Sequence, residues 1–159
     1  MLAVFFFLLG ASIGSFLNVV IHRMPEGESL LTPPSHCPDC GSRIRWYDNI
    51  PVISYIILGG KCRECDVGIP VRYLIVESIT AFLFLYGYLN YGLSIEFLTF
   101  AVFVTLLIPI SFIDFSRMLI PDSLSISGIV AGLVLSLFRG VFIISLIGAA
   151  AGAVYILLM

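Results

Sequence analysis

Residues 1–21, MLAVFFFLLGASIGSFLNVVI, form an apolar run without a single charged side chain. A helix needs about 20 such residues to cross the hydrocarbon core of a bilayer. The run has no basic segment before it and no clear small-residue cleavage site, and Ser15 and Asn18 lie inside it, so it predicts a retained helix rather than a signal peptide. Four further apolar runs follow, at 73–93, 96–113, 121–138 and 141–159. We predict an all-α polytopic membrane protein with about five transmembrane helices.

The composition agrees with a membrane protein. Hydrophobic residues make up 60% of the chain, charged residues only 11%, and the mean hydropathy is +1.11. Soluble domains are nearer to half apolar and a quarter charged. A chain of 159 residues cannot bury this much apolar surface in one core, so the lipid bilayer is the expected partner. The net charge of −2 and the lack of a basic run predict no nucleic-acid partner.

The charges divide the chain into a first transmembrane helix at 1–21, a polar insert at 22–72 and a membrane part at 73–159. Six of the eight basic residues fall within the insert. Because basic residues are enriched in cytoplasmic loops, the N-terminus is expected outside, which places the insert and Arg117 inside and only Arg139 outside. The last run reaches Met159 without a polar tail, and we expect further sequence beyond it.

All four cysteines lie in the insert, as Cys37-Pro-Asp-Cys40 and Cys62-Arg-Glu-Cys65. Two CxxC pairs are typical of a tetrahedral zinc site with four cysteine ligands, in which the backbone amides of each tight turn point toward the sulfurs. Four sulfur ligands leave no open position, so a structural zinc is favoured in a small zinc-ribbon-like module. A redox dithiol pair or disulfides are the alternatives, but the predicted cytoplasmic location disfavours disulfides.

Two acidic residues lie where carboxylates are costly. Glu77 falls near the start of the second span, where the simplest role is a pairing with Arg72 or Arg45. Asp114 falls at the end of the third span, at the unfavourable pole of the helix dipole. In a structural interpretation, the positive charge of Arg117 compensates for the unfavourable position of the Asp114 carboxylate. In a functional interpretation, Asp114 is a catalytic or binding residue. Asp122, by contrast, suits the first turn of a helix that begins near Pro121.

Six segments together resemble the type IV prepilin peptidases, the bifunctional leader peptidases/N-methyltransferases. The matching segments are Gly14–Pro25, Cys37–Cys40, Tyr47–Tyr55, Gly59–Cys65, Ile69–Glu77 and Asp114–Asp122. The resemblance implies an aspartyl protease of the bacterial inner membrane, of the Gly-x-Gly-Asp type, that acts at the cytoplasmic face. Such enzymes remove the leader of prepilins and pseudopilins after a glycine and methylate the new N-terminus with S-adenosylmethionine.

The resemblance also implies roles for individual residues. Asp114 matches one of the two catalytic aspartates, and the region 37–77 matches the part associated with methyl transfer. Glu77, Gly59 and Gly60 are therefore candidates for the S-adenosylmethionine site, although a turn before the second cysteine pair is the simpler role for the glycines.

The chain departs from the family in one respect. It has no Gly-x-Gly-Asp sequence, and Asp114 and Asp122 are its only acidic residues after residue 100. We therefore expect that the chain alone does not cleave. A methyltransferase without protease activity and a non-catalytic zinc-bearing membrane adaptor are the alternatives, and a membrane thiol oxidoreductase is the weakest one.

Overall fold

The computed structural model describes residues 1–158, and every regular element in them is a helix. The long helices are α1 (Leu2–Arg23), α3 (Arg72–Tyr91), α4 (Ile95–Arg117), α5 (Asp122–Phe138) and α6 (Phe142–Leu158). The insert adds the 3-10 helices η1 (Met24–Glu26) and η2 (Trp46–Asn49) and the short helix α2 (Ile53–Ile57). The predicted all-α class and the five apolar segments are thus confirmed as helices.

Three helical segments are long and apolar enough to cross a membrane, namely Leu2–Glu26, Arg72–Tyr91 and Ile95–Arg117. The helices α5 and α6 are apolar but only 17 residues long each. Of the five or so spans that the sequence predicts, three are long and apolar enough to cross a membrane, and the other two are apolar helices that are shorter. Helix α5 is short because Pro121 holds an extended conformation before it and Gly140, with φ 68°, follows its end.

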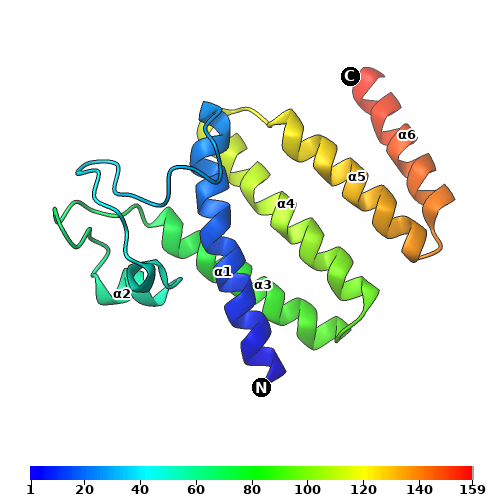
Figure 1. Ribbon diagram of the computed structural model, residues 1–159. Helices are drawn as coiled ribbons and strands as arrows, with labels where there is room; N and C mark the ends of the chain where they lie inside the picture. Colours follow the sequence, from blue (N-terminus) through cyan, green and yellow to red (C-terminus); the bar gives the residue numbers. More distant parts are fainter. Residues whose placement is uncertain (159) are drawn as a thin grey trace.

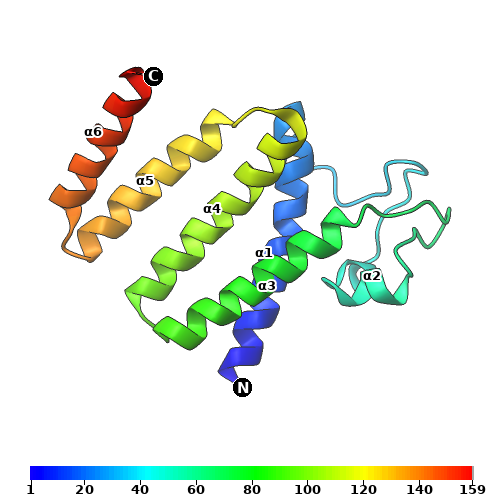
Figure 2. The ribbon, with the colours of Figure 1, turned by 180° about the vertical axis from the view of Figure 1, so that it is seen from behind.

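Helices α1, α3 and α4 form the centre of the structure, and α5 and α6 continue outward in chain order (Figure 1). Figure 2 shows from behind that α1 crosses α3, while the insert lies to the side of α1, past the start of α3. One cluster of buried apolar side chains joins α1, α3 and α4. Its members include Phe6, Leu17, Val76, Phe84, Phe97, Val104, Ile108 and Ile113.

Helices α1 and α3 approach closely at Gly10 and Gly14, which form a Gly-x-x-x-Gly sequence. A Cβ atom on Gly10 would lie 2.8 Å from the backbone oxygen of Thr80, and one on Gly14 would lie 2.8 Å from the Cα of Glu77. Small residues at this spacing let two membrane helices come into backbone contact. The close crossing fixes where the start of α3, and with it the end of the insert, lies against α1.

Gly14→Ala is expected to destabilise the helix pair by about 1–3 kcal/mol, because backbone atoms of α3 must move to admit the new methyl group. The thermal transition of the purified protein in detergent measures the effect. Gly132→Ala on α5 is the matched control, since nothing lies within 4 Å of a Cβ atom there. A Gly14→Ala transition no lower than that of the control would contradict the close crossing.

The insert and the α4–α5 connection lie at the same end of the helices. Arg117 Nη2 is 2.6 Å from Glu26 Oε1, although the two residues are 91 positions apart. This ion pair replaces the predicted compensation of Asp114 by Arg117, because the Arg117 side chain is bonded to the first turn of the insert instead. The contact also agrees with a topology in which the insert and Arg117 share one side of the membrane.

Candidate functional site

The two cysteine pairs form two equivalent tight turns, which we call the knuckles (Cys37–Arg43 and Cys62–Gly68). In the first, Gly41 N–H donates to Cys37 O and Cys37 N–H to Ser42 O. In the second, Asp66 N–H donates to Cys62 O and Cys62 N–H to Val67 O. Gly41 and Asp66 both have positive φ, a conformation that glycine and aspartate tolerate better than most residues. Isolated β-bridges close both turns, so the zinc-ribbon-like prediction is met by paired turns rather than by strands.

The four sulfur atoms converge on one point. All lie within 4.8 Å of one another, and none of the four cysteines is in a disulfide. Cys37 Sγ and Cys65 Sγ are 3.8 Å apart. A tetrahedron with metal–sulfur bonds of about 2.3 Å has edges of about 3.8 Å, so the four thiols fit a zinc ion.

Hydrogen bonds to Cys40 and Cys62 favour the thiolate form that a metal needs. In the cluster without metal, a backbone N–H lowers the pKa of the Cys65 thiol, but burial and hydrogen bonds to the other three cysteines outweigh it and raise this pKa to about 12. The hydroxyl and the backbone N–H of Ser42 lower the pKa of the Cys40 thiol to about 6. The backbone N–H groups of Glu64 and Cys65 lower the pKa of the Cys62 thiol. The predicted orientation of the backbone amides toward the sulfurs is therefore present in both knuckles.

Tyr47 and two arginines hold the second knuckle against η2. Arg63 makes two hydrogen bonds to the Asp48 carboxylate, at 2.6 and 2.9 Å, and this contact lowers the pKa of Asp48. Arg45 bonds both Tyr47 Oη at 2.7 Å and Glu64 at 3.2 Å. Both guanidinium groups lie within 6 Å of the Tyr47 ring, at cation–π distance. These bonds orient the second knuckle: Arg63 is bonded to Asp48, 15 positions away, and Glu64 is bonded to Arg45, 19 positions away.

Glu77 does not pair with an arginine. Its Oε2 accepts a 2.7 Å hydrogen bond from the backbone N–H of Val52, so the predicted pairing with Arg72 or Arg45 is wrong. Arg45 is held by Glu64 instead, and the guanidinium of Arg72 lies 5.5 Å from the Tyr73 ring. The Glu77 carboxylate therefore fastens the insert to the second turn of α3.

Val52 itself has an unusual backbone. Its φ of 64° and ψ of −51°, with a 2.6 Å hydrogen bond from Ile53 N–H to Pro51 O, define a γ-turn of the rare type. A β-branched residue in this conformation costs on the order of 1–3 kcal/mol. The bond to Glu77 compensates for part of this cost, and it points the N–H of Val52 toward the helices.

Gly59 and Gly60 end α2 and lead into the second knuckle, as their structural interpretation predicts. Both have positive φ. A Cβ atom on Gly60 would lie 2.9 Å from Tyr55 Oη, whereas nothing lies within 4 Å of one on Gly59. Of the two glycines, only Gly59 therefore leaves space for a ligand to approach its backbone.

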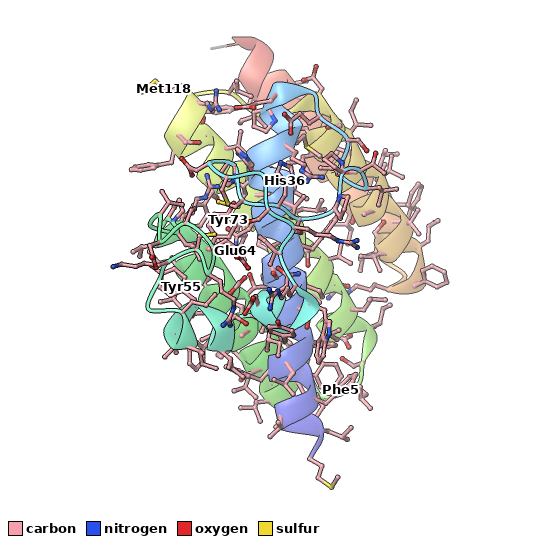
Figure 3. The ribbon with its side chains drawn as sticks, turned by 60° about the vertical axis from the view of Figure 1, so that its left-hand side comes forward. Phe5, His36, Tyr55, Glu64, Tyr73 and Met118 are labelled. Atoms are coloured by element: carbon pink, nitrogen blue, oxygen red, sulfur yellow. The ribbon has the colours of Figure 1, made fainter. Side chains whose placement is uncertain are left out.

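Asp114 lies in the last turn of α4, with its side chain exposed and its carbonyl oxygen bonded to Met118 N–H at 2.7 Å. Asp122 opens α5 and is also exposed. The two carboxylates thus flank the α4–α5 connection, at the end of the helices where the insert is attached through Glu26. Figure 3 shows Met118 at this end and the insert, with His36, Tyr55 and Glu64 labelled, in front of α1.

Two features of the site were missed from sequence although a signal existed. Asn18 is fully buried and donates to Tyr73 O at 3.1 Å, so it joins α1 to the first turn of α3. A lone amide in an apolar run is such a signal. The Gly-x-x-x-Gly spacing of Gly10 and Gly14 is the other.

Comparison with known proteins gives a consistent family. The family described as bacterial peptidase A24 N-terminal domain matches residues 8–91. Proteins named prepilin leader peptidase/N-methyltransferase are similar in Myxococcus xanthus (43% identity, 94% of this chain and 45% of the relative), Dichelobacter nodosus (40%, 95% and 63%) and Klebsiella pneumoniae (40%, 84% and 61%). The chain therefore spans between 45% and 63% of the length of these relatives.

No solved structure matches the chain. The family match covers both knuckles, all of α3 and α1 from residue 8 onward. The chain therefore belongs to the bacterial peptidase A24 family, that of the type IV prepilin leader peptidases.

Proposed function

We propose that this chain forms part of an enzyme that cleaves the leader from type IV prepilins or pseudopilins and methylates the new N-terminus. The family match over residues 8–91, with relatives that carry this name, is the observation on which the proposal rests. In the proposed topology, the N-terminus is periplasmic and the insert lies at the cytoplasmic face of the bacterial inner membrane. The substrate's apolar segment then stays in lipid while its leader reaches the exposed end of α4.

Asp114 supplies one of two catalytic carboxylates in this proposal. One carboxylate activates water and the other protonates the leaving amide, and two carboxylates at close range share one proton between them. The exposed position of Asp114 at the end of an apolar helix supports the role, because it gives the carboxylate water next to the membrane. The 159 residues contain no Gly-x-Gly-Asp sequence, so the second carboxylate comes from outside them.

A zinc ion bound by Cys37, Cys40, Cys62 and Cys65 has a structural part in this proposal. The convergence of the four sulfurs supports it. Four thiolates complete the coordination of the metal, so it offers no position to water or to the substrate. It takes no part in the hydrolysis.

A chimera tests the proposed function. Residues 1–159 replace the matching segment of the Myxococcus xanthus relative, and the rest of that relative is kept. We expect the chimera to cleave a prepilin in reconstituted membranes, whereas residues 1–159 alone do not. Cleavage by residues 1–159 alone would contradict the two-carboxylate proposal, and an inactive but folded chimera would contradict the proposed function.

Methyl transfer without cleavage is a second candidate, because the family match covers the whole insert. S-adenosylmethionine carries a positive sulfonium and amine, for which the Glu77 carboxylate is a suitable partner. Gly59 leaves its backbone open to a ligand, and Gly60 shapes the turn. Transfer of a labelled methyl group to a pre-cleaved pilin peptide measures the activity. Glu77→Gln keeps an acceptor for Val52 N–H and removes the charge, so we expect lower transfer with unchanged thermal stability. Unchanged methyl transfer by Glu77→Gln would contradict a role of Glu77 in cofactor binding and leave it only its hydrogen bond to Val52.

A further inference from the structure

The short helix α2 exposes an apolar face that nothing in the described part of the chain covers. Ile53, Ile56 and Ile57 share one side of the helix and are 49%, 66% and 72% exposed. Ser54 lies outside this face and is buried, donating to Tyr47 O at 2.7 Å. Tyr55 also turns inward and donates to Ile69 O. The exposure is therefore that of an amphipathic helix rather than that of a loosely attached segment.

The bond between Val52 and Glu77 fixes where α2 begins along α3. Val52 immediately precedes α2, and Glu77 is five residues along α3 from Arg72, which is about 7–8 Å at 1.5 Å per residue. Helix α2 thus begins beside the second turn of α3, a helix that is long and apolar enough to cross a membrane. Both ribbon views place α2 beside the first turns of α3 (Figures 1 and 2). Val71, just before α3, and Ile75, on α3, are exposed apolar residues in the same region.

The residues around this face are of the kinds that gather at membrane surfaces. Trp46 is 81% exposed on η2, which is fixed to α2 by the Ser54 hydrogen bonds to Tyr47 O and Ile50 N. Lys61 follows the end of α2 and is also exposed. Tryptophan prefers the headgroup level of a bilayer, and lysine pairs with anionic headgroups.

We propose that the α2 face, made of Ile53, Ile56 and Ile57, lies in the headgroup region of the bilayer on the insert side, with Trp46 and Lys61 at its rim. An interfacial helix buries its apolar side about 5–10 Å into the boundary between headgroups and acyl chains, and the rise of about 7–8 Å along α3 from Arg72 to Glu77 is of the same size. The lipid surface thereby becomes a further attachment of the insert, besides α1, α3 and the Glu26–Arg117 ion pair to α4. This inference is independent of the proposed catalytic function.

Tryptophan fluorescence tests the proposal, because Trp46 is the single tryptophan of the chain. The reporter is Ile56→Trp in a Trp46→Phe background, and Asp39→Trp in the same background is the control on the exposed tip of the first knuckle. Both are reconstituted in phosphatidylethanolamine–phosphatidylglycerol vesicles that contain lipids brominated on the acyl chain. We expect the brominated lipid to quench the tryptophan at position 56 at least about twofold more strongly than the one at position 39, and aqueous iodide to show the opposite order.

The outcomes show whether lipid, water or a protein surface contacts the α2 face. Equal quenching of the two positions by brominated lipid, or free access of iodide to position 56, overturns the proposal. Protection of position 56 from both quenchers also overturns it, because a protein surface then covers the face. The unaltered chain supplies a second measurement: its Trp46 should emit at shorter wavelength in vesicles than after unfolding of the insert, and a fully water-exposed emission contradicts the rim position.

Discussion

Asp114→Asn is expected to lower prepilin cleavage by the chimera by about 10³-fold or more, because it leaves one carboxylate where the reaction needs two. Asparagine has nearly the same shape but neither takes up nor releases a proton. The substitution also leaves the fold in place. The Asp114 side chain is exposed, and the helix end is closed through its backbone oxygen rather than through its carboxylate.

Cleavage is measured as the rate of leader release from a purified prepilin in vesicles. Glu96→Gln is the matched control, since Glu96 is an acid of the same helix in its first turn, at the end opposite to Asp114. It should cleave as the parent chimera does. An Asp114→Asn chimera that retains more than about a tenth of the parental rate would rule out a proton-transferring role for Asp114.

Removal of the metal is expected to unfold the insert while α1, α3 and α4 stay folded. Between residues 24 and 71 the only buried side chains are those of Cys37 and Ser54, so this part of the chain has almost no core of its own. Binding of a structural zinc contributes on the order of 10–16 kcal/mol in small domains of this kind. Helices α1, α3 and α4, by contrast, share a continuous apolar cluster that does not involve the knuckles.

Cys62→Ser should therefore lose most of its zinc and should lose amide protection across residues 37–65, with its helical circular dichroism nearly unchanged. Zinc per chain and hydrogen exchange measure the two effects. Asp39→Asn is the control, because it changes an exposed residue between two ligands and removes no sulfur. If the parent protein purifies without zinc, or if Cys62→Ser keeps one zinc per chain, the structural metal is refuted.

Much of this arrangement was predictable from local sequence. The positions of the apolar helices and of the polar insert follow from composition within windows of about 20 residues. The knuckles follow from the CxxC spacing, since two short turns are enough to present four sulfurs. The location of Asp114 at the end of a helix follows from the run of apolar residues before it and the proline after it.

Contacts between distant residues were harder to predict. The pairing of Glu77 with an arginine was expected from charge alone. In the structure, the Glu77 carboxylate instead accepts a hydrogen bond from the N–H of Val52, 25 residues away. Arg117 was expected to compensate Asp114 one turn away, but it bonds Glu26 across 91 residues. In both cases the partner is distant in sequence and comes within reach only through the packing of the insert against the helices.

The sequence by itself determined the membrane character, the insert and its four metal-binding thiols, because each depends on residues that are close along the chain. Only the tertiary structure decided how the insert is attached, since that depends on the approach of α1 and α3 at Gly10 and Gly14. The bond between Val52 and Glu77 then fixes where α2 begins along α3, and the fold of the insert leaves its isoleucines exposed. Distances between elements far apart in sequence are set by packing, and packing is a property of the folded chain as a whole.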